Sequence, residues 1–272
     1  MKVAITGASG FVSSHLIKTF TDFVSIHRDE SEDEILSKLE GVDVVFNLAG
    51  APIINKWSES YKKVLLSSRV DTTRTLVNAI NKSEVKHFIS TSAVGAYPDD
   101  APFDESFKGY GEDFLATLTQ LWEAEASKCT KPTTIIRFGV ILGSDGGALA
   151  QMLPPFKVGL GGIIGDGKMM TSWIDVDDLV RVYEYILENK LTGTFNATAP
   201  NPVTNYVFTK ALGKVLHRPT FLPLPVFVLK LLFGEGSTVL TGSKEVYPKA
   251  LLDAGFEFHY PEINASLEHL LA

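Results

Sequence analysis

The chain has 272 residues and a formal net charge of −7, and 45% of its residues are hydrophobic while 21% are charged. This length suits one large α/β domain, or a nucleotide-binding core with a smaller lobe. The acidic balance disfavours binding to nucleic acid or to an anionic membrane surface. The longest apolar stretch, residues 221–233, is too short to span a bilayer, and the first residues do not resemble a signal peptide. We therefore expect a cytoplasmic protein with no nucleic-acid or membrane partner.

The first half of the chain alternates short β-branched runs with segments of helical pattern. Continuous apolar strands separated by helices predict a parallel sheet that is covered on both faces. Right-handed crossovers then give a doubly wound, Rossmann-like sheet of the α/β class. The expected strands are residues 3–6, 23–27, 42–48, 86–90 and 133–138. The expected helices are residues 10–20, 31–39, 58–81 and 112–128.

The second half of the chain is predicted to add a smaller, mainly helical substrate lobe. Residues 144–170 are rich in glycine and proline, and a helix over 177–188 precedes a short strand near 193–196. Further helices are expected at residues 205–216, 225–233 and 261–271. We therefore predict a dinucleotide-binding core over residues 1–143, continued by 172–199, and a lobe made of residues 144–171 and 200–272.

The clearest motif is Thr6-Gly7-Ala8-Ser9-Gly10-Phe11-Val12-Ser13, which follows the first strand and opens the first helix. In that context Gly7 permits a tight turn and Gly10 lets the backbone approach a pyrophosphate. The free amides and the positive dipole of the helix start would face the phosphates. Ser13 stands where the usual pattern has a third glycine, a position that serves helix packing. The alternative interpretation is a structural turn without a nucleotide.

The end of the second strand indicates which dinucleotide binds. It reads His27-Arg28-Asp29, at the position that lies over the adenosine ribose. An acidic residue there favours NAD, whereas an arginine pairs with the 2′-phosphate of NADP. Because Arg28 comes first, we favour NADP(H). The alternative is that Arg28 pairs with Asp29 or Glu30 at the surface.

Beyond these motifs, the chain resembles a known family. The third strand ends in Asn47-Leu48-Ala49-Gly50, which with the first motif is typical of extended short-chain dehydrogenase/reductases. The remaining motifs are similar to one atypical subgroup, the epimerase-like NADP-binding family with a C-terminal domain of unassigned function. They are residues 49–53, 56–57, 68–74, 92–95, 114–116, 122–123, 146–149, 159–162, 173–174, 177–179, 218–219 and 255–256.

The resemblance implies a bound NADP(H) and a set of contacts to it. The pyrophosphate, the 2′-phosphate and the adenosine would each have their own group of residues, and two further residues would reach the cofactor from the helices. The implied residues are Gly7, Ser9, Gly10, Phe11 and Val12 for the pyrophosphate, His27 and Arg28 for the 2′-phosphate, Leu48, Ala49 and Gly50 for the adenosine side, Arg69 from the long helix, and Leu115 near the nicotinamide half.

The usual catalytic pair of the superfamily, a Tyr-x-x-x-Lys on a helix, is missing. Counting back from Glu123, the tyrosine position holds Leu115 and the lysine position holds Thr119, and neither can act as the usual acid/base pair. Ser92 and Tyr97 are candidate substitutes near the fourth strand. The alternatives are that Ser92 bonds the backbone and that Tyr97 packs with its hydroxyl satisfied.

Two hypotheses of different kinds follow. The first is an NADP(H)-dependent oxidoreductase or epimerase acting on an unidentified small carbonyl or hydroxyl substrate. The second is a catalytically inactive NADP(H)-binding redox sensor or partner protein. Residues 168–175 are expected to face the substrate, with Asp175 where the subgroup has a histidine. No His/Cys cluster has metal-ligand spacing, so no metal site is predicted. By analogy, the long helix over 58–81 would pair in a homodimer.

Overall fold

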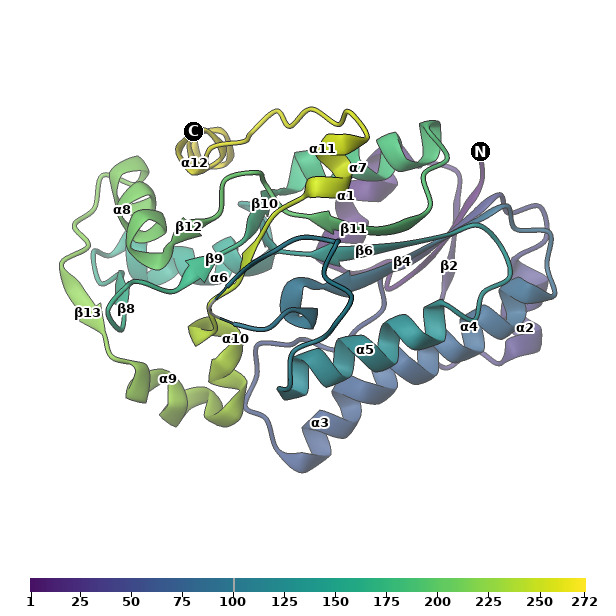
Figure 1. Cartoon of the computed structure of the whole chain (residues 1–272), viewed down its shortest axis with the longest axis horizontal. Coiled ribbons are helices and arrows are strands. Elements are labelled where there is room, and N and C mark those ends of the chain that lie inside the picture. The colour runs from purple at the N-terminus through teal and green to yellow at the C-terminus, as the bar shows by residue number, and fades with distance from the viewer. Residues whose placement is uncertain (100) are drawn as a thin grey trace.

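The computed structural model describes residues 1–99 and 101–272. Within this part of the chain, the central feature is a six-stranded parallel sheet in the order β11-β6-β4-β3-β1-β2 (Figure 1). β2 lies on one side of β1, and all other strands of the sheet lie on the other side. This confirms the doubly wound prediction, and it puts the switch point, where such sheets bind ligands, between β1 and β3. The strands are β1 (Val3–Thr6), β2 (Phe23–Ile26), β3 (Val44–Asn47), β4 (His87–Ala93), β6 (Thr133–Phe138) and β11 (Gly193–Ala197).

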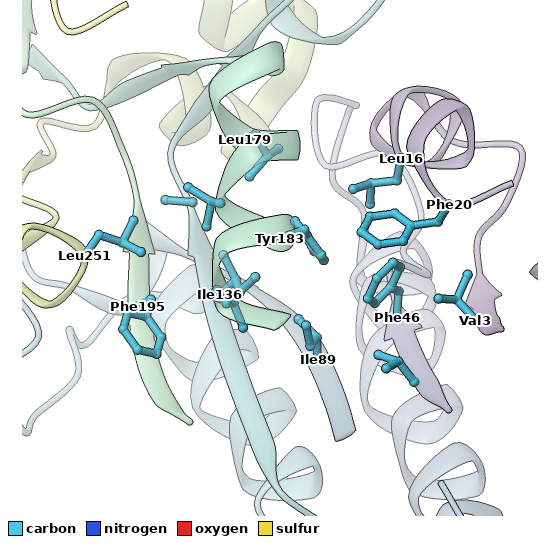
Figure 2. Packing of buried hydrophobic residues seen from close by; sticks show 14 of the residues in the cluster. Val3, Leu16, Phe20, Phe46, Ile89, Ile136, Leu179, Tyr183, Phe195 and Leu251 are labelled. Carbon is cyan, nitrogen blue, oxygen red and sulfur yellow. The ribbon is translucent and has the colours of Figure 1, made fainter. Parts of the chain in front are cut away.

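Helices cover both faces of this sheet because alternate strand residues point in opposite directions. Val3 faces α1 (Phe11–Thr19) and α7 (Val176–Glu188), whereas Ala4 belongs to the core beneath α2 (Glu32–Lys38) and α4 (Thr72–Asn81). Figure 2 shows the first core, where Tyr183 of α7 lies between Phe46 and Ile136. α5 (Phe114–Ala126) lies beside α4 on the second face (Figure 1).

The segment predicted as one helix over residues 58–81 is continuous but not uniform. It consists of α3 (Glu59–Leu66), a π-helical turn (Ser67–Asp71) and α4. Ser58 caps its start, with Oγ accepting from the Tyr61 amide at 3.1 Å. A π turn widens the helix locally, and such turns are frequent at functional sites. The turn carries Arg69, whose side chain lies at the cavity described below.

The remaining described residues form short strand pairs and helices beside the sheet. Their shared core contains Trp173, Phe156 and Leu212. The four pairs are β10–β7, β12–β9, β13–β8 and β14–β5. The additional helices are α6 (Gly147–Lys157), α8 (Asn205–Val215), α9 (Val226–Phe233), α10 (Thr238–Thr241), α11 (Lys249–Asp253) and α12 (Ile263–Leu271). The short strands are β5 (Pro102–Phe103), β7 (Val140–Leu142), β8 (Gly162–Ile164), β9 (Met170–Thr171), β10 (Trp173–Asp175), β12 (Val203–Thr204), β13 (Leu222–Leu224) and β14 (Glu245–Val246).

The helices predicted near residues 205–216, 225–233 and 261–271 correspond to α8, α9 and α12. The expected boundaries between core and lobe stay a prediction. Among residues 1–99 and 101–272, no helix combines the length and the apolar character that crossing a bilayer requires.

Candidate functional site

A cavity of about 380 Å³ opens at the switch point of the sheet, between the turn after β1 and the helix α5. Its wall comes from the carboxyl ends of β3, β4 and β6 and from the starts of α1 and α5, so distant parts of the chain meet there. Nine of the predicted site residues line this cavity: Gly10, Phe11, Val12, Leu48, Ala49, Gly50, Arg69, Ser92 and Leu115. Gly7, Ser9, His27, Arg28 and Tyr97 lie outside its wall.

The turn between β1 and α1 depends on the glycine at position 7. Gly7 has a φ of +67°, and a Cβ added there would lie 2.9 Å from the carbonyl oxygen of Leu48. The Gly7 carbonyl accepts from the amide of Gly10 and from the hydroxyl of Ser13, each at 2.8 Å. Ser13 therefore closes the turn with a hydrogen bond, in the position where the usual pattern has its third glycine.

The start of α1 has the properties of an anion site. Its first turn carries no acidic residue, and no side chain caps it. The first backbone amide that makes a helical hydrogen bond in α1 is that of Ser14, which donates to the carbonyl oxygen of Gly10 at 2.9 Å. The amides of Phe11 and Val12 therefore have no acceptor in the helix, and the helix dipole adds a positive potential at this point.

The Phe11 ring is held by the glycine-rich loop that precedes α6. A Cβ added at Gly143 would lie 2.4 Å from this ring, and one at Gly146 would lie 2.2 Å from it. His15, one turn along α1, lies 3.1 Å from the carboxylate of Asp145 in the same loop. The glycines therefore let this backbone lie directly against the start of α1 and fix the cavity wall.

Buried hydrogen bonds fix the end of β3 beside the turn. The Thr6 hydroxyl donates to Asn47 Oδ1 at 2.8 Å and accepts from the amides of Leu48 and Ala49 at 3.0 and 3.1 Å. The Asn47 amide group donates to Thr73 Oγ1 at 2.7 Å. The chain therefore leaves β3 in one defined path along the cavity.

Arg69 is a half-buried cation at the cavity and has no carboxylate partner among the described residues. Its Nη2 donates to Ala51 O at 3.0 Å, and its guanidinium lies 5.4 Å from the Trp122 ring centroid. Burial lowers the pKa of Arg69 to about 10. The side chain is still charged at neutral pH, and an anionic ligand would compensate this charge.

His27 and Arg28 are exposed just beyond the end of β2. Among the described residues, Arg28 forms no ion pair, and Glu30 pairs with Lys38 instead. The surface pair of Arg28 with Asp29 or Glu30 is therefore not formed, and the guanidinium is accessible to a ligand.

Leu115 and Thr119, which occupy the usual tyrosine and lysine positions, both lie on the cavity wall. The Thr119 hydroxyl donates to the carbonyls of Leu115 and Ala116 within α5, each at 2.9 Å. These two positions therefore present neither a phenol nor a cation to the cavity.

The two candidate substitutes differ in their surroundings. Ser92 lines the cavity, and its buried hydroxyl donates to Glu123 Oε1 at 2.5 Å. Tyr97 is fully buried, donates to Asn196 Oδ1 at 3.0 Å, and packs under the guanidinium of Arg137. Burial raises the pKa of Tyr97 above its usual value, although Arg137 opposes the shift. Tyr97 thus has the geometry of the packing alternative, with its hydroxyl satisfied away from the cavity.

Glu123 forms a buried polar cluster that the sequence analysis did not identify. Its carboxylate accepts from Arg137 Nε and Nη2 and from the Tyr110 hydroxyl, all at 2.8 Å. Burial opposes the charged form of Arg137, but the bonds to Glu123 outweigh it and raise the pKa of this arginine. Burial together with the Glu123 carboxylate raises the pKa of Tyr110 to about 12. The sequence did contain a signal for this cluster. A mostly apolar helix carries an acidic residue, Glu123, and the apolar strand at 133–138 carries an arginine, and buried charges pair.

Residues 168–175 do not line the cavity. Asp175 is buried, its Oδ2 accepts from Ser266 at 2.6 Å, and burial raises its pKa. Asp175, Asp177 and His269 bring ligand-type atoms within 4.8 Å of one another. His269 lies 2.9 Å from Asp177, and Asp175 caps α7, so these contacts join α12 to α7.

Comparison with known proteins agrees with this arrangement. Residues 3–198 match the NAD dependent epimerase/dehydratase family, and residues 224–270 match a domain of unknown function, DUF1731. The chain is 38% identical to an epimerase family protein SDR39U1 homolog, chloroplastic, of Arabidopsis thaliana, over 100% of this chain and 87% of that protein. It is 35% identical to the epimerase family protein SDR39U1 of Mus musculus, over 100% of both chains.

A solved structure extends this agreement to the whole fold. The crystal structure of human epimerase family protein SDR39U1 (isoform 2) with NADPH has a TM-score of 0.92 to this chain at 32% identity, covering 100% of this chain and 99% of that one. The resemblance found in the sequence is thereby confirmed. The chain belongs to the NAD dependent epimerase/dehydratase family, in its atypical short-chain dehydrogenase/reductase branch with a C-terminal DUF1731 domain.

Proposed function

We propose that the cavity binds NADP(H). The observation that carries this proposal is the pairing of two anion-binding features at the switch point: the free amides at the start of α1, and Arg69 without a carboxylate partner among the described residues. A dinucleotide supplies the phosphates that such features bind. The human relative solved with NADPH supports the choice of cofactor.

We assign the residues at the cavity, the turn before α1 and the end of β2 to different parts of this cofactor. The turn and the start of α1 would hold the pyrophosphate, and the accessible guanidinium of Arg28 would take the 2′-phosphate. The end of β3 would lie along the adenosine side, and Leu115 would contact the nicotinamide half. The proposed contacts are Gly7, Ser9, Gly10, Phe11, Val12, His27, Arg28, Leu48, Ala49, Gly50, Arg69 and Leu115.

We propose further that the chain is an enzyme, an NADP(H)-dependent oxidoreductase or epimerase for a small carbonyl or hydroxyl compound held against Ser92. The cofactor supplies hydride exchange when it is bound. The protein's own contribution is to orient the reactants, to exclude water and to manage the proton. Ser92 supports this assignment because it lines the cavity at the carboxyl end of β4.

A second candidate function is a catalytically inactive NADP(H)-binding protein that senses redox state or serves as a partner. One specific observation favours it. Leu115 and Thr119 line the cavity in place of the usual tyrosine and lysine, so this wall offers no acid/base pair. Both candidates require the cofactor, and they differ in whether the bound cofactor is turned over.

A fluorescence titration with NADPH and with NADH tests the cofactor proposal. The wild type should bind NADPH more tightly than NADH. Removing a charge-assisted bond in Arg28→Ala should weaken NADPH binding about tenfold to a hundredfold and leave NADH binding nearly unchanged. Lys18→Ala is the matched control, because Lys18 is an exposed cation at the opposite end of α1. Equal affinities for both nucleotides, unaffected by Arg28→Ala, would contradict NADP(H), and binding of neither would reject the proposal.

A further inference from the structure

The hydrogen-bonding role of Ser92 is set by its neighbour Glu123. Both side chains are buried, with exposed fractions of 1% and 5%, and the Ser92 hydroxyl donates to Glu123 Oε1 at 2.5 Å. A serine hydroxyl has a single proton and two acceptor sites. While the Glu123 carboxylate is ionised, the Ser92 proton points to it, so the Ser92 oxygen accepts from a substrate hydroxyl in the cavity. When Glu123 carries a proton, the direction reverses, and Ser92 donates to a substrate carbonyl.

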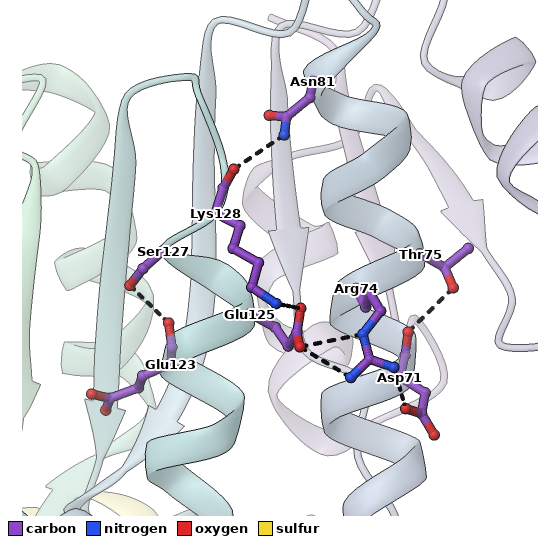
Figure 3. Close-up of polar contacts among 8 residues, drawn as sticks. All are labelled: Asp71, Arg74, Thr75, Asn81, Glu123, Glu125, Ser127 and Lys128. Atoms are coloured by element: carbon purple, nitrogen blue, oxygen red, sulfur yellow. Dashed lines mark hydrogen bonds and ion pairs between the residues drawn. The ribbon is translucent and has the colours of Figure 1, made fainter.

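The sheet register explains why Ser92 and Glu123 meet. Ser92 of β4 is paired with Arg137 of β6, so both side chains extend from the same face of the sheet toward α5. Arg137 donates to both carboxylate oxygens of Glu123, each at 2.8 Å. Glu125, two residues later on α5, points the other way toward Arg74 and Lys128 (Figure 3). Glu123 is therefore held rigidly behind Ser92.

Glu123 also reaches a second cavity. This cavity has a volume of about 400 Å³ and is lined by Glu123 and Arg137 together with Tyr110 and Lys108. Glu123 therefore contacts the first cavity through Ser92 and the second cavity directly. A proton that arrives on its carboxylate has a route to water that does not pass through the cofactor cavity.

We propose that Ser92 and Glu123 together carry out the proton transfer for which Leu115 and Thr119 provide no group. This inference rests on the proposed function as an NADP(H)-dependent enzyme. When a substrate alcohol is oxidised, its O–H bond breaks and its proton forms a new O–H bond on Ser92. The original Ser92 proton passes to Glu123 Oε1, and the electron pair of the substrate C–H bond leaves as hydride to NADP⁺. The substrate becomes a carbonyl, NADP⁺ is reduced to NADPH, and Glu123 returns its proton to water. Reduction is the reverse sequence.

The two residues have different roles in this scheme. Ser92 is the catalytic residue because its oxygen contacts the substrate. Glu123 is a positioning residue: it fixes the direction of the Ser92 proton and accepts that proton. Tyr110 and Arg137 keep the Glu123 carboxylate in place.

The pairing can be tested first in the ligand-free protein by proton NMR. A short bond between a hydroxyl and a carboxylate should give a hydroxyl resonance far downfield of ordinary serine protons. It should be present in the wild type and absent in Ser92→Ala. Ser127→Ala is the matched control, because the Ser127 hydroxyl donates at 2.8 Å to the main-chain carbonyl of Glu123 rather than to its carboxylate (Figure 3). A downfield resonance that survives in Ser92→Ala, or none in the wild type, would overturn the pairing.

Turnover tests the proton transfer, with 9,10-phenanthrenequinone as the carbonyl probe and NADPH consumption as the readout. Ser92→Ala and Glu123→Gln should each lower kcat about a hundredfold, the loss typical of removing one acid/base group. NADPH affinity should stay within about twofold of the wild type, and the double variant should be no slower than either single one, because coupled residues are not additive. Ser127→Ala should turn over the probe at the wild-type rate.

The outcomes separate this inference from the proposed function. Glu123→Gln leaves Arg137 buried with a neutral partner, which can destabilise the fold. Ser92→Ala keeps the ion pair between Glu123 and Arg137, so this variant is the decisive test of the proton transfer. A wild type that does not bind NADPH rejects the proposed function. If the wild type and Ser92→Ala turn over the probe at the same rate, only the Ser92–Glu123 inference is overturned. A wild type that binds NADPH without turnover of the probe overturns the proton transfer and favours the inactive binding protein.

Discussion

The two sides of the cavity have followed the superfamily pattern to different extents. The turn after β1 keeps Gly7 and Gly10 and replaces one glycine by a serine that bonds back to the turn. The opposite side, on α5, has Leu115 and Thr119 where the acid/base pair normally stands. Phosphate binding depends on backbone amides and a single backbone conformation, whereas proton transfer depends on particular side chains. The comparison indicates that nucleotide binding is retained independently of the usual chemistry, which can then move to other side chains.

The largest expected effect on NADPH affinity is at Gly7, the position in the turn after β1 that least tolerates an added side chain. In Gly7→Ala a side chain is forced into a positive φ, and its Cβ lies 2.9 Å from Leu48 O. We expect NADPH affinity to fall about a hundredfold or more, equivalent to roughly 3 kcal/mol. Gly41→Ala is the control: Gly41 has a φ of +70° but nothing within 4 Å of an added Cβ, so it tests backbone strain alone. Equal NADPH affinities of the two variants in a fluorescence titration would contradict this account of the turn.

A smaller effect, about tenfold on NADPH affinity, is expected for Arg69→Met. Burial lowers the pKa of Arg69 to about 10, and only the charged form attracts a phosphate. Wild-type affinity should therefore fall as the pH rises through about 10, while the affinity of Arg69→Met should stay flat over that range. Lys63→Met, at an exposed position on α3, is the control. An Arg69→Met variant that binds NADPH as tightly as the wild type at neutral pH would show that Arg69 does not contact the cofactor.

The smallest effect is expected at Ser13, where the binding side departs from the usual pattern. Ser13→Ala removes the hydrogen bond to Gly7 O and should cost about 1 kcal/mol of the free energy of unfolding. Ser13→Gly, which restores the usual glycine, should cost roughly 1 kcal/mol more because glycine is a poor helix residue. Urea unfolding measures both changes. NADPH affinity should stay within about twofold, and a large loss of affinity would mean that Ser13 itself binds the cofactor.

The main strands and helices could be predicted from the sequence because their apolar patterns are continuous. The expected strands at residues 23–27 and 42–48 are longer than β2 and β3, since β1 offers only four residues for pairing on each side. β4 instead runs past residue 90 to Ala93, because β6 provides partners up to Phe138. The two- and three-residue strands were not predicted, because tertiary contacts rather than local pattern create them.

The candidate site was only partly accessible from the sequence. The glycine turn and the end of β3 are local motifs, and both lie at the cavity or directly beside it. The role of Glu123 depends on the register that aligns Ser92 with Arg137, and no local pattern encodes that register. The partner of Tyr97 is Asn196, which is 99 residues away in the chain. Contacts of this kind decide whether a polar side chain faces a cavity or the core, and they follow from the packed fold.

The most direct test of the central claim is to measure NADPH affinity and turnover on the same preparation of Ser92→Ala. Binding and proton transfer are carried by different sides of the cavity in this account. It predicts an affinity within about twofold of the wild type together with a fall of about a hundredfold in kcat. If affinity and turnover fell in parallel, or if neither changed, the division of the cavity into a binding side and a proton-transfer side would be contradicted.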